Sequence, residues 1–386
     1  MPTWLRLSLA GSATLLVGMG LGRFSYSPLI PALIESGTLT AAEAGSVGAS
    51  NFAGYLIGAL AAPLIRKRFG ETASVRLCLV LAFLSLLGSA LPLGFFWLAF
   101  CRALVGACIG VMMIYAVAIV TRAAPPDRLG VANALVFCGV GVGILCAGTL
   151  IPWLLKSGLM YAWVGIAILG GAAALIAIWG WAPADTVTQP GEKAAIIKVE
   201  WSSLVLGFVA ARTMFSLGMI PHSIYWVDFL VRGLERDIGF GGFHWVLFGL
   251  GAIVGTFLWG WLADRIGFRA GLTLAFASLG LGVGLPVLFP VSWILVFSSV
   301  VVGAQPGVTA LLSGRIHQLL GPERMAPVWR LSALAATVIQ AVAGYLFVAV
   351  FAMTGSYMPV FLLGAAAMLT GAAISLMLRL PPGREE

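Results

Sequence analysis

The sequence LSLAGSATLLVGMGLGRFSYSPLIPALI occupies residues 7–34, and this stretch decides the class of fold. It is long enough to cross the roughly 30 Å hydrocarbon core of a bilayer as a helix, and Arg23 is its only charged residue. An arginine at membrane depth is costly unless a partner or a water-filled cavity receives its charge, and it does not shed its proton. Arg23 is therefore predicted to be a binding-site cation.

The composition of the whole chain supports a membrane protein. Of its 386 residues 61% are hydrophobic and only 9% are charged, which is more apolar surface than a soluble core can bury. The apolar runs are continuous rather than alternating, so a helical protein is favoured over a β-barrel. The five cysteines show neither the spacing of metal ligands nor that of disulfide loops, so we interpret them as packing residues. No metal site and no cofactor is expected.

Apolar runs of roughly 20 residues predict twelve membrane spans. They lie at residues 5–34, 44–65, 74–91, 96–120, 130–154, 158–181, 202–228, 241–262, 270–288, 291–312, 327–351 and 357–378. The first is interpreted as an uncleaved span rather than a signal peptide. A polar segment at 183–200 predicts a cytoplasmic linker between two six-helix bundles, residues 1–182 and 201–386, the second with a short cytoplasmic tail.

The distribution of basic residues predicts the orientation in the membrane. With both termini inside, sixteen of the 22 lysines and arginines lie on the inner side. Lys156, Arg232 and Arg236 lie on the outer side, and the other three arginines lie within spans. The expected location is a bacterial inner membrane crossed many times. Because the net charge of +8 comes from cations placed between spans, it indicates topology and not a nucleic-acid partner.

The loop after the eighth span reads GWLADRIGFR, residues 260–269. It resembles the cytoplasmic signature of the major facilitator superfamily. By that resemblance Asp264, Arg265 and Arg269 form a gating latch on the cytoplasmic side. The corresponding first-half loop departs from the pattern, because Pro63 replaces the leading glycine and Lys67 stands where the aspartate belongs. A symmetrical pair of latches is therefore not expected.

Two further stretches carry the same resemblance. Arg102 to Gly110 (RALVGACIG) is similar to the Arg-x-x-x-Gly motif of the fourth helix, and its glycine spacing predicts tight packing on one helix face. Residues 22–31 (GRFSYSPLIP) with 51–59 (NFAGYLIGA) resemble the YbfB/YjiJ group of the superfamily over the full length. This implies a secondary transporter that works by alternating access between two bundles. By resemblance, Arg102 takes part in proton coupling, and a structural role is the alternative.

Candidate substrate ligands lie within several spans, and the first and seventh spans line the central cavity in this superfamily. Arg23 and Arg212 are expected to attract an anion there, unless they are structural arginines that bond helix-end carbonyls. Tyr26 lies three residues from Arg23 and can donate to the same ligand, or it belongs to an aromatic belt. Asn51 and Gln305 are uncharged polar residues within spans, and each can bond a ligand or a neighbouring helix.

Candidate proton carriers are few. His222 and Asp228 can titrate near neutral pH once they are partly buried. Asp228 alternatively forms an ion pair with Arg232 four residues on, near the outer interface. His317, in an inner loop, is expected to be solvated.

These features predict a monomeric transporter of a small organic anion or zwitterion, such as a carboxylate or an amino acid, with protons as the coupling ion. The alternative is an exporter of lipophilic compounds, although such a protein favours an acidic residue where Arg23 stands. A membrane-embedded enzyme or a sensor is the other class considered. Neither a catalytic arrangement nor a nucleotide-phosphate loop supports an enzyme or ATP drive.

Overall fold

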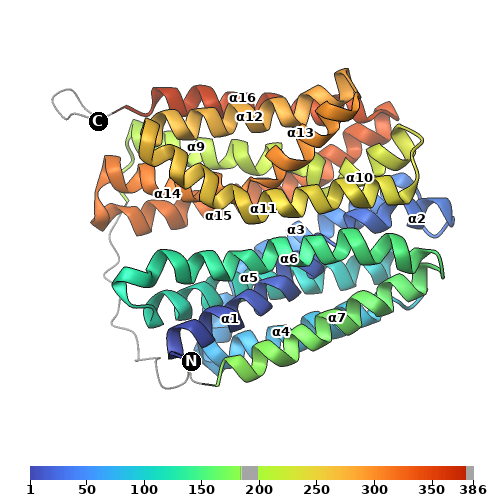
Figure 1. Ribbon diagram of the computed structural model, residues 1–386, viewed down its shortest axis with the longest axis horizontal. Coiled ribbons are helices and arrows are strands. Elements are labelled where there is room, and N and C mark those ends of the chain that lie inside the picture. Colours follow the sequence, from blue (N-terminus) through green and yellow to red (C-terminus); the bar gives the residue numbers. More distant parts are fainter. Residues whose placement is uncertain (183, 185–198, 380–386) are drawn as a thin grey trace. The chain divides into compact units, whose positions relative to one another are not determined.

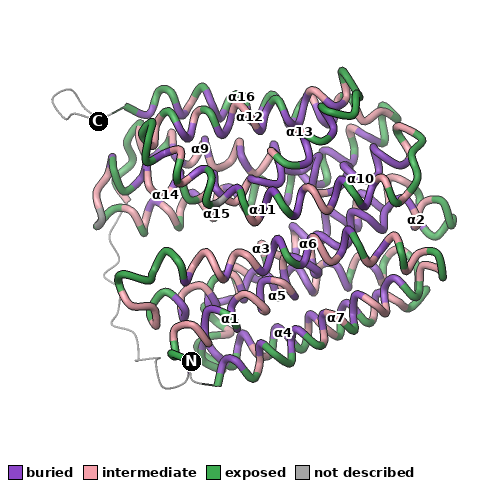
Figure 2. Tube along the Cα trace, in the orientation of Figure 1, coloured by how far each residue is buried: buried purple, intermediate pink, exposed green. Residues whose placement is uncertain are grey.

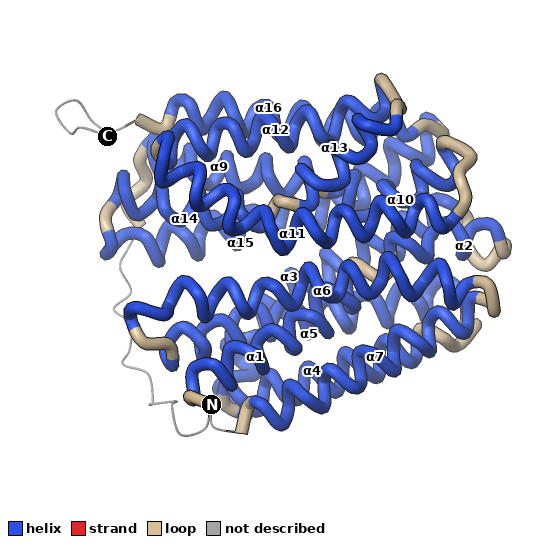
Figure 3. The backbone as a smooth tube through the Cα atoms, in the orientation of Figure 1, coloured by secondary structure: helices blue, strands red, loops and turns tan. Residues whose placement is uncertain are grey.

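The computed structural model describes residues 1–182, 184 and 199–379, and all regular structure in them is helical (Figure 3). Eleven of the described helices are long and apolar enough to cross a membrane. A pair of shorter helices that meet at a 45° bend completes a twelfth span. The predicted class, an all-α membrane protein with twelve spans, is confirmed.

The chain divides into two compact units, and the first comprises Met1–Glu192 and Trp226–Gly249. Its long helices α1, α4, α6 and α7 lie side by side in Figure 1. The elements up to residue 182 are α1 (Thr3–Leu15), the π-helix η1 (Leu16–Arg23), η2 (Ser27–Leu29), α2 (Ile30–Glu35), α3 (Ala41–Phe69), α4 (Glu71–Gly88), α5 (Gly94–Ala123), η3 (Pro126–Arg128), α6 (Leu129–Leu155) and α7 (Leu159–Gly180).

The second unit comprises Lys193–Tyr225 and Leu250–Glu386. The elements after the linker are α9 (Ser203–Gly218), η4 (Pro221–Tyr225), α10 (Trp226–Asp228), η5 (Phe229–Gly233), α11 (Ile238–Ile266), α12 (Phe268–Leu288), α13 (Ser292–Gly303), α14 (Pro306–Leu320), α15 (Pro322–Thr354) and α16 (Tyr357–Met377). Helices α10 and η5 and the N-terminal half of α11 belong to the first unit. The predicted linker at 183–200 and the tail at 380–386 lie almost wholly outside the described residues, so the division at 182 and 201 stays a prediction.

Exposed and buried residues alternate around the long helices (Figure 2). The exposed faces are apolar: Phe96 is 85% exposed and Leu175 is 70% exposed. Exposure of such apolar faces to water is unfavourable in free energy, whereas contact with lipid tails is not. The buried faces are rich in small residues, which lets the helix backbones approach closely.

The contact of α3 with α5 is the clearest case of this close packing. Gly54 and Gly58 of α3 lie against the backbone of Ala103 and Ala107. In return, Gly106 and Gly110 of α5 lie against the backbone of α3 at Asn51 and Tyr55. A Cβ atom at any of these glycines would overlap the facing helix. The packing role predicted for the glycines after Arg102 is confirmed, and it brings Asn51 close to Arg102.

The loop after the second span and the loop after the eighth span have the same backbone geometry. Helices α3 and α4 are joined by Gly70 alone, and α11 and α12 are joined by Gly267 alone. Both glycines take a left-handed backbone conformation, with φ of 80° and 82°. Residues with a side chain rarely adopt this backbone conformation, so each sharp turn requires a glycine.

The predicted ends of the spans at 270–288 and 327–351 agree with the structure to within three residues, because α12 ends at Leu288 and α15 ends at Thr354. The predicted span at 291–312 is broken into α13 and α14 at Gln305 and Pro306. Proline has no N–H group for the helix ladder, and this allows the 45° bend.

Candidate anion-binding site

The first span is irregular where it carries Arg23. Its α-helix changes at Leu16 to a π-helix that ends at Arg23, and the chain bends before η2 begins at Ser27. Glycines at 18, 20 and 22 weaken the regular helix, and Pro28 and Pro31 provide no N–H for it. Backbone carbonyls at such a break are open to side-chain donors, and π-helical turns occur often at functional sites.

A ring of hydrogen bonds joins three helices at this break. Arg23 Nε donates to Asn51 Oδ1 at 2.9 Å, and Asn51 Nδ2 donates to the Arg102 carbonyl at 3.1 Å. Arg102 Nη2 donates back to the Arg23 carbonyl at 2.9 Å. Asn51 and Arg102 are each 1% exposed. The structure therefore brings together Arg23, Asn51 and Arg102, which the sequence marked separately.

Aromatic rings lie close to both guanidinium groups. Arg23 Cζ lies 4.9 Å from the ring centre of Tyr55 and 5.2 Å from that of Phe52. Arg102 Cζ lies 4.8 Å from the ring centre of Tyr26. Cation–π contacts of this kind stabilise a buried cation without neutralising it.

Tyr26 lies in the turn between the π-helix and η2. Its hydroxyl group donates to the Ala44 carbonyl at 2.9 Å. This bond fixes the ring that lies against Arg102, and the predicted contact of Tyr26 with the substrate stays a prediction.

The two arginines carry hydrogen-bond donors that no described residue accepts. Arg23 Nη2, Arg102 Nε and Arg102 Nη1 are buried and have no hydrogen-bond partner within the described chain. Nor does any carboxylate of the described residues lie within ion-pair distance of either guanidinium. Buried charged donors without partners are unfavourable, and an oxyanion satisfies them with short, charge-assisted hydrogen bonds. The arrangement suits an anion that carries a carboxylate.

The other two predicted ligands lie in the second unit. Arg212 of α9 stacks on Trp329 of α15, with Cζ 3.6 Å from the ring centre. Gln305 lies at the break between α13 and α14 and precedes Pro306. The predicted role of both residues in substrate binding stays a prediction.

His222 also lies in the second unit and is fully buried. Its Nε2 is 2.9 Å from Ser298 Oγ, and that hydroxyl donates to the Gly282 carbonyl at 2.6 Å. Because the single hydroxyl proton goes to Gly282, the serine oxygen accepts from His222 Nε2–H. The ring of Phe361 packs edge-on against the imidazole at 5.5 Å.

Asp228, in the first unit, lies 3.3 Å from Arg232, as the four-residue spacing predicts, and it is 1% exposed. The ion pair that was predicted as the alternative role of Asp228 is therefore present in the structure. Whether it also carries a proton stays a prediction.

The loop residues of the family signature are arranged at the ends of helices. Arg265 stacks on Trp261 at 4.0 Å, and Arg269 donates to the Leu376 carbonyl at 2.8 Å from Nη2. Asp264 is exposed at the end of α11. These contacts lie within the second unit, and the predicted gating role stays a prediction.

The first unit has an acidic residue at this loop that the sequence reasoning missed. Glu71 begins α4, is buried, and pairs with Arg66 at 3.3 Å and with Arg122 of α5. Its ion pairs join the ends of α3, α4 and α5. Glu71 thus supplies an acidic group at the loop where Lys67 stands in place of the signature aspartate. The sequence feature that could have identified it is an acidic residue that follows the glycine at the end of the basic loop.

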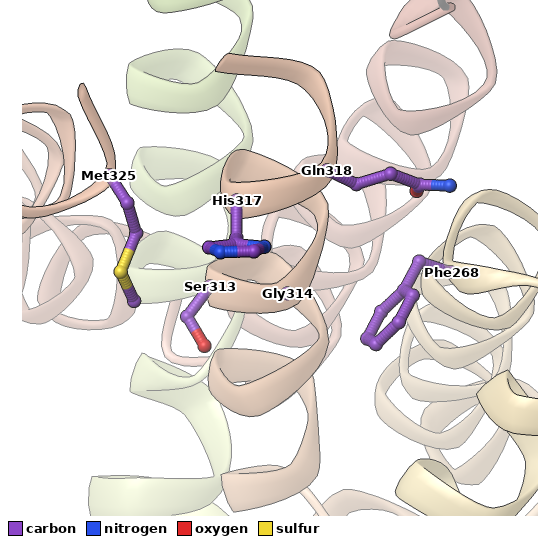
Figure 4. A pocket seen from close by; sticks show the side chains of 6 residues that line it. All are labelled: Phe268, Ser313, Gly314, His317, Gln318 and Met325. Carbon is purple, nitrogen blue, oxygen red and sulfur yellow. The ribbon is translucent and has the colours of Figure 1, made fainter. Parts of the chain in front are cut away.

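A separate cavity of about 450 Å³ lies in the second unit (Figure 4). Its lining residues are Phe268, Ser313, Gly314, His317, Gln318 and Met325. His317 is exposed, as predicted. None of the predicted substrate ligands lines this cavity. Among the described residues, no group of three His, Cys, Asp or Glu side chains is arranged to hold a metal ion.

Comparison with known proteins defines the class. Residues 15–376 match the profile of the family described as "Uncharacterised MFS-type transporter YbfB". The chain thus belongs to this family of MFS-type transporters.

Particular relatives agree with this class. The 3-(3-hydroxy-phenyl)propionate transporter of Escherichia coli (strain K12) is 27% identical over 238 residues. That match covers 58% of this chain and 56% of the relative, so only about half the length of each is compared.

Solved structures of transporters share the fold. A D-xylose–proton symporter has a TM-score of 0.72 at 15% identity and covers 98% of both chains. The nucleoside transporter NupG also has a TM-score of 0.72, at 13% identity, and the match covers 97% of this chain and 99% of that one. The predicted major facilitator fold is confirmed.

Proposed function

We propose that this transporter carries a small organic anion, and that its substrates are aromatic carboxylates of the 3-arylpropionate kind. The observation that carries the proposal is the pair of buried arginines, Arg23 and Arg102, with three unpartnered N–H groups and no carboxylate beside them among the described residues. A carboxylate ligand supplies the missing acceptors.

An aromatic substrate follows from two further observations. Arg23 lies beside the rings of Tyr55 and Phe52, which offer apolar surface next to the charge. The Escherichia coli relative is named as a transporter of a phenyl-substituted propionate. An aryl group on those rings, with its carboxylate on Arg23, satisfies both the apolar and the charged parts of the site.

In this proposal the residues have different roles. Arg23 binds the carboxylate, and Asn51 orients its guanidinium. Arg102, which lies over the ring of Tyr26, holds the backbone carbonyl of Arg23. Arg212 and Gln305 are proposed as further substrate ligands. His222 or Asp228 is proposed to carry the coupled proton, and Asp264, Arg265 and Arg269 are proposed to gate the cytoplasmic side.

We further propose that the protein is a monomer in a bacterial inner membrane, with both termini in the cytoplasm. The excess of basic residues in the loops on the side of the termini supports this orientation. Protons are the proposed coupling ion.

Ligand-induced thermal stabilisation of the purified protein tests the function. A ligand that binds only the folded state raises the apparent stability. We expect 3-(3-hydroxyphenyl)propionate to raise the melting temperature of the parent and to lose this effect in Arg23→Gln. Arg6→Gln is the matched control, because Arg6 also stacks on an aromatic ring, that of Trp179, but at an end of the helices.

Uptake into proteoliposomes under an imposed inward proton gradient tests transport and coupling. A response to lipophilic cations alone would overturn the anion proposal and support an exporter of lipophilic compounds. An aromatic acid that stabilises Arg23→Gln as much as the parent would show that Arg23 is structural.

A further inference from the structure

Three aromatic side chains pack together directly after the arginine of the candidate site. Phe24 follows Arg23, and its ring centre lies 6.1 Å from those of both Trp245 and Phe248. Trp245 and Phe248, from the N-terminal half of α11, stack at 4.9 Å with an interplanar angle of 10°. All three rings are buried within the first unit. We refer to them as the Phe24 cluster.

The indole of Trp245 contains an unexplained donor. Trp245 has no exposed surface, and its Nε1–H has no hydrogen-bond partner within the described residues. An indole nitrogen can only donate, so an acceptor must come from elsewhere. Burial of an N–H group without an acceptor costs free energy, and phenylalanine would fill an aromatic cluster without that cost.

The position of the donor relates it to the substrate. Consecutive Cα atoms are about 3.8 Å apart, so the residue that binds the carboxylate and the ring that contacts Trp245 are immediate neighbours. The guanidinium of Arg23 faces the rings of α3, while the side chain of Phe24 packs on α11. The unpartnered donors of Arg23 and Trp245 therefore both belong to side chains that lie at this backbone segment.

We propose that the Nε1–H group of Trp245 recognises an acceptor oxygen on the aromatic ring of the substrate, and that it selects oxygen-substituted arylpropionates over unsubstituted ones. This inference rests on the proposed function, in which Arg23 holds the carboxylate of the same molecule. A buried donor that loses its partner discriminates strongly against the analogue without the acceptor.

Three acids test the inference on the parent protein. We expect 3-(3-hydroxyphenyl)propionate and 3-(3-methoxyphenyl)propionate to bind about tenfold more tightly than 3-phenylpropionate in isothermal titration. The methoxy compound is decisive, because it can accept a hydrogen bond but cannot donate one. If it binds as weakly as 3-phenylpropionate, the indole is not the partner and the inference is wrong.

The variant Trp245→Phe removes the donor and keeps an aromatic ring. We expect the tenfold preference to disappear, with little change in the affinity for 3-phenylpropionate. Trp259→Phe is the matched control, since Trp259 lies further along α11 and also has a buried indole N–H without a partner in the described chain. It belongs to the second unit and is expected to leave the preference unchanged.

The outcomes separate the two proposals. If the parent binds all three acids, Arg23→Gln binds none and Trp245→Phe keeps the preference, only the role of Trp245 is overturned. If the parent binds none of the three acids, the proposed function is overturned together with this inference.

Discussion

At the scale of single residues, Asn51 has the most demanding position in the site. Its amide accepts from the side chain of Arg23 and donates to the carbonyl of Arg102, so one uncharged side chain fixes two helices that carry cations. An aspartate at this position would instead place a carboxylate beside the guanidinium. The amide orients the charge of Arg23 without neutralising it, and the positive charge remains for a ligand.

Substitutions at Asn51 should consequently separate stability from binding. We expect Asn51→Asp to keep or raise the melting temperature, because an internal ion pair forms, and to lower the affinity for 3-(3-hydroxyphenyl)propionate by about a hundredfold or more. Thermal unfolding and isothermal titration measure the two effects.

Asn133→Asp serves as the control for the added charge, because among the described residues the Asn133 side chain bonds Thr121 and the Leu129 carbonyl, near the ends of α5 and α6. Unchanged affinity in Asn51→Asp would show that the anion binds away from Arg23.

At the scale of elements, the register of α3 against α5 determines the site. Gly106 lies against the Asn51 carbonyl, one turn of α5 from Arg102. A displacement of either helix moves the asparagine relative to both arginines. The close packing of α3 and α5 thus supports the proposed binding geometry as well as stability.

Gly106→Ala is expected to lower the free energy of unfolding by about 1–3 kcal/mol, because the new methyl group overlaps the α3 backbone. It should also weaken anion binding, since it displaces Asn51. Gly130→Ala in α6 is the control. Its Cβ meets nothing within 4 Å, so the better helix propensity of alanine should be neutral or stabilising. Equal effects of the two substitutions on unfolding and titration would contradict a role for close packing.

The sequence predicts these elements better than it predicts their irregularities. Apolar runs and the charged loops locate the spans, because a backbone in lipid must satisfy its own hydrogen bonds and so forms helices. The π-helical turns at 16–23 and 221–225 have no comparable linear signal. They depend on partners from other helices, such as the Arg102 side chain that bonds the carbonyl of Arg23.

Prediction of the candidate site from the sequence has the same limit. Arg23, Asn51 and Arg102 stand out individually as polar residues within apolar runs. Their hydrogen-bonded ring depends on helix register, which no stretch of sequence contains. Tyr55 could have been found from its position four residues after Asn51 on the same helical face, whereas Trp245 carried no signal apart from its type.

At the scale of the whole molecule, the unneutralised arginines affect the transport cycle. A transporter that works by alternating access must return without substrate after net transport, and it must return with substrate during exchange. Here the empty return leaves the buried donors of Arg23 and Arg102 without an acceptor from the described chain. In the proposed function, the carboxylate of the bound substrate supplies this acceptor. The loaded transition is therefore expected to have the lower barrier, since each 1.4 kcal/mol changes a rate about tenfold.

Exchange should accordingly be faster than net flux. We expect proteoliposomes loaded with 3-(3-hydroxyphenyl)propionate to release it at least about tenfold faster when the same acid is outside than when the outside buffer lacks it. Asn51→Asp supplies an internal carboxylate, so the remaining transport in this variant should lose most of the difference. Equal rates of exchange and net efflux in the parent would show that a group other than the substrate neutralises the arginines during the empty return.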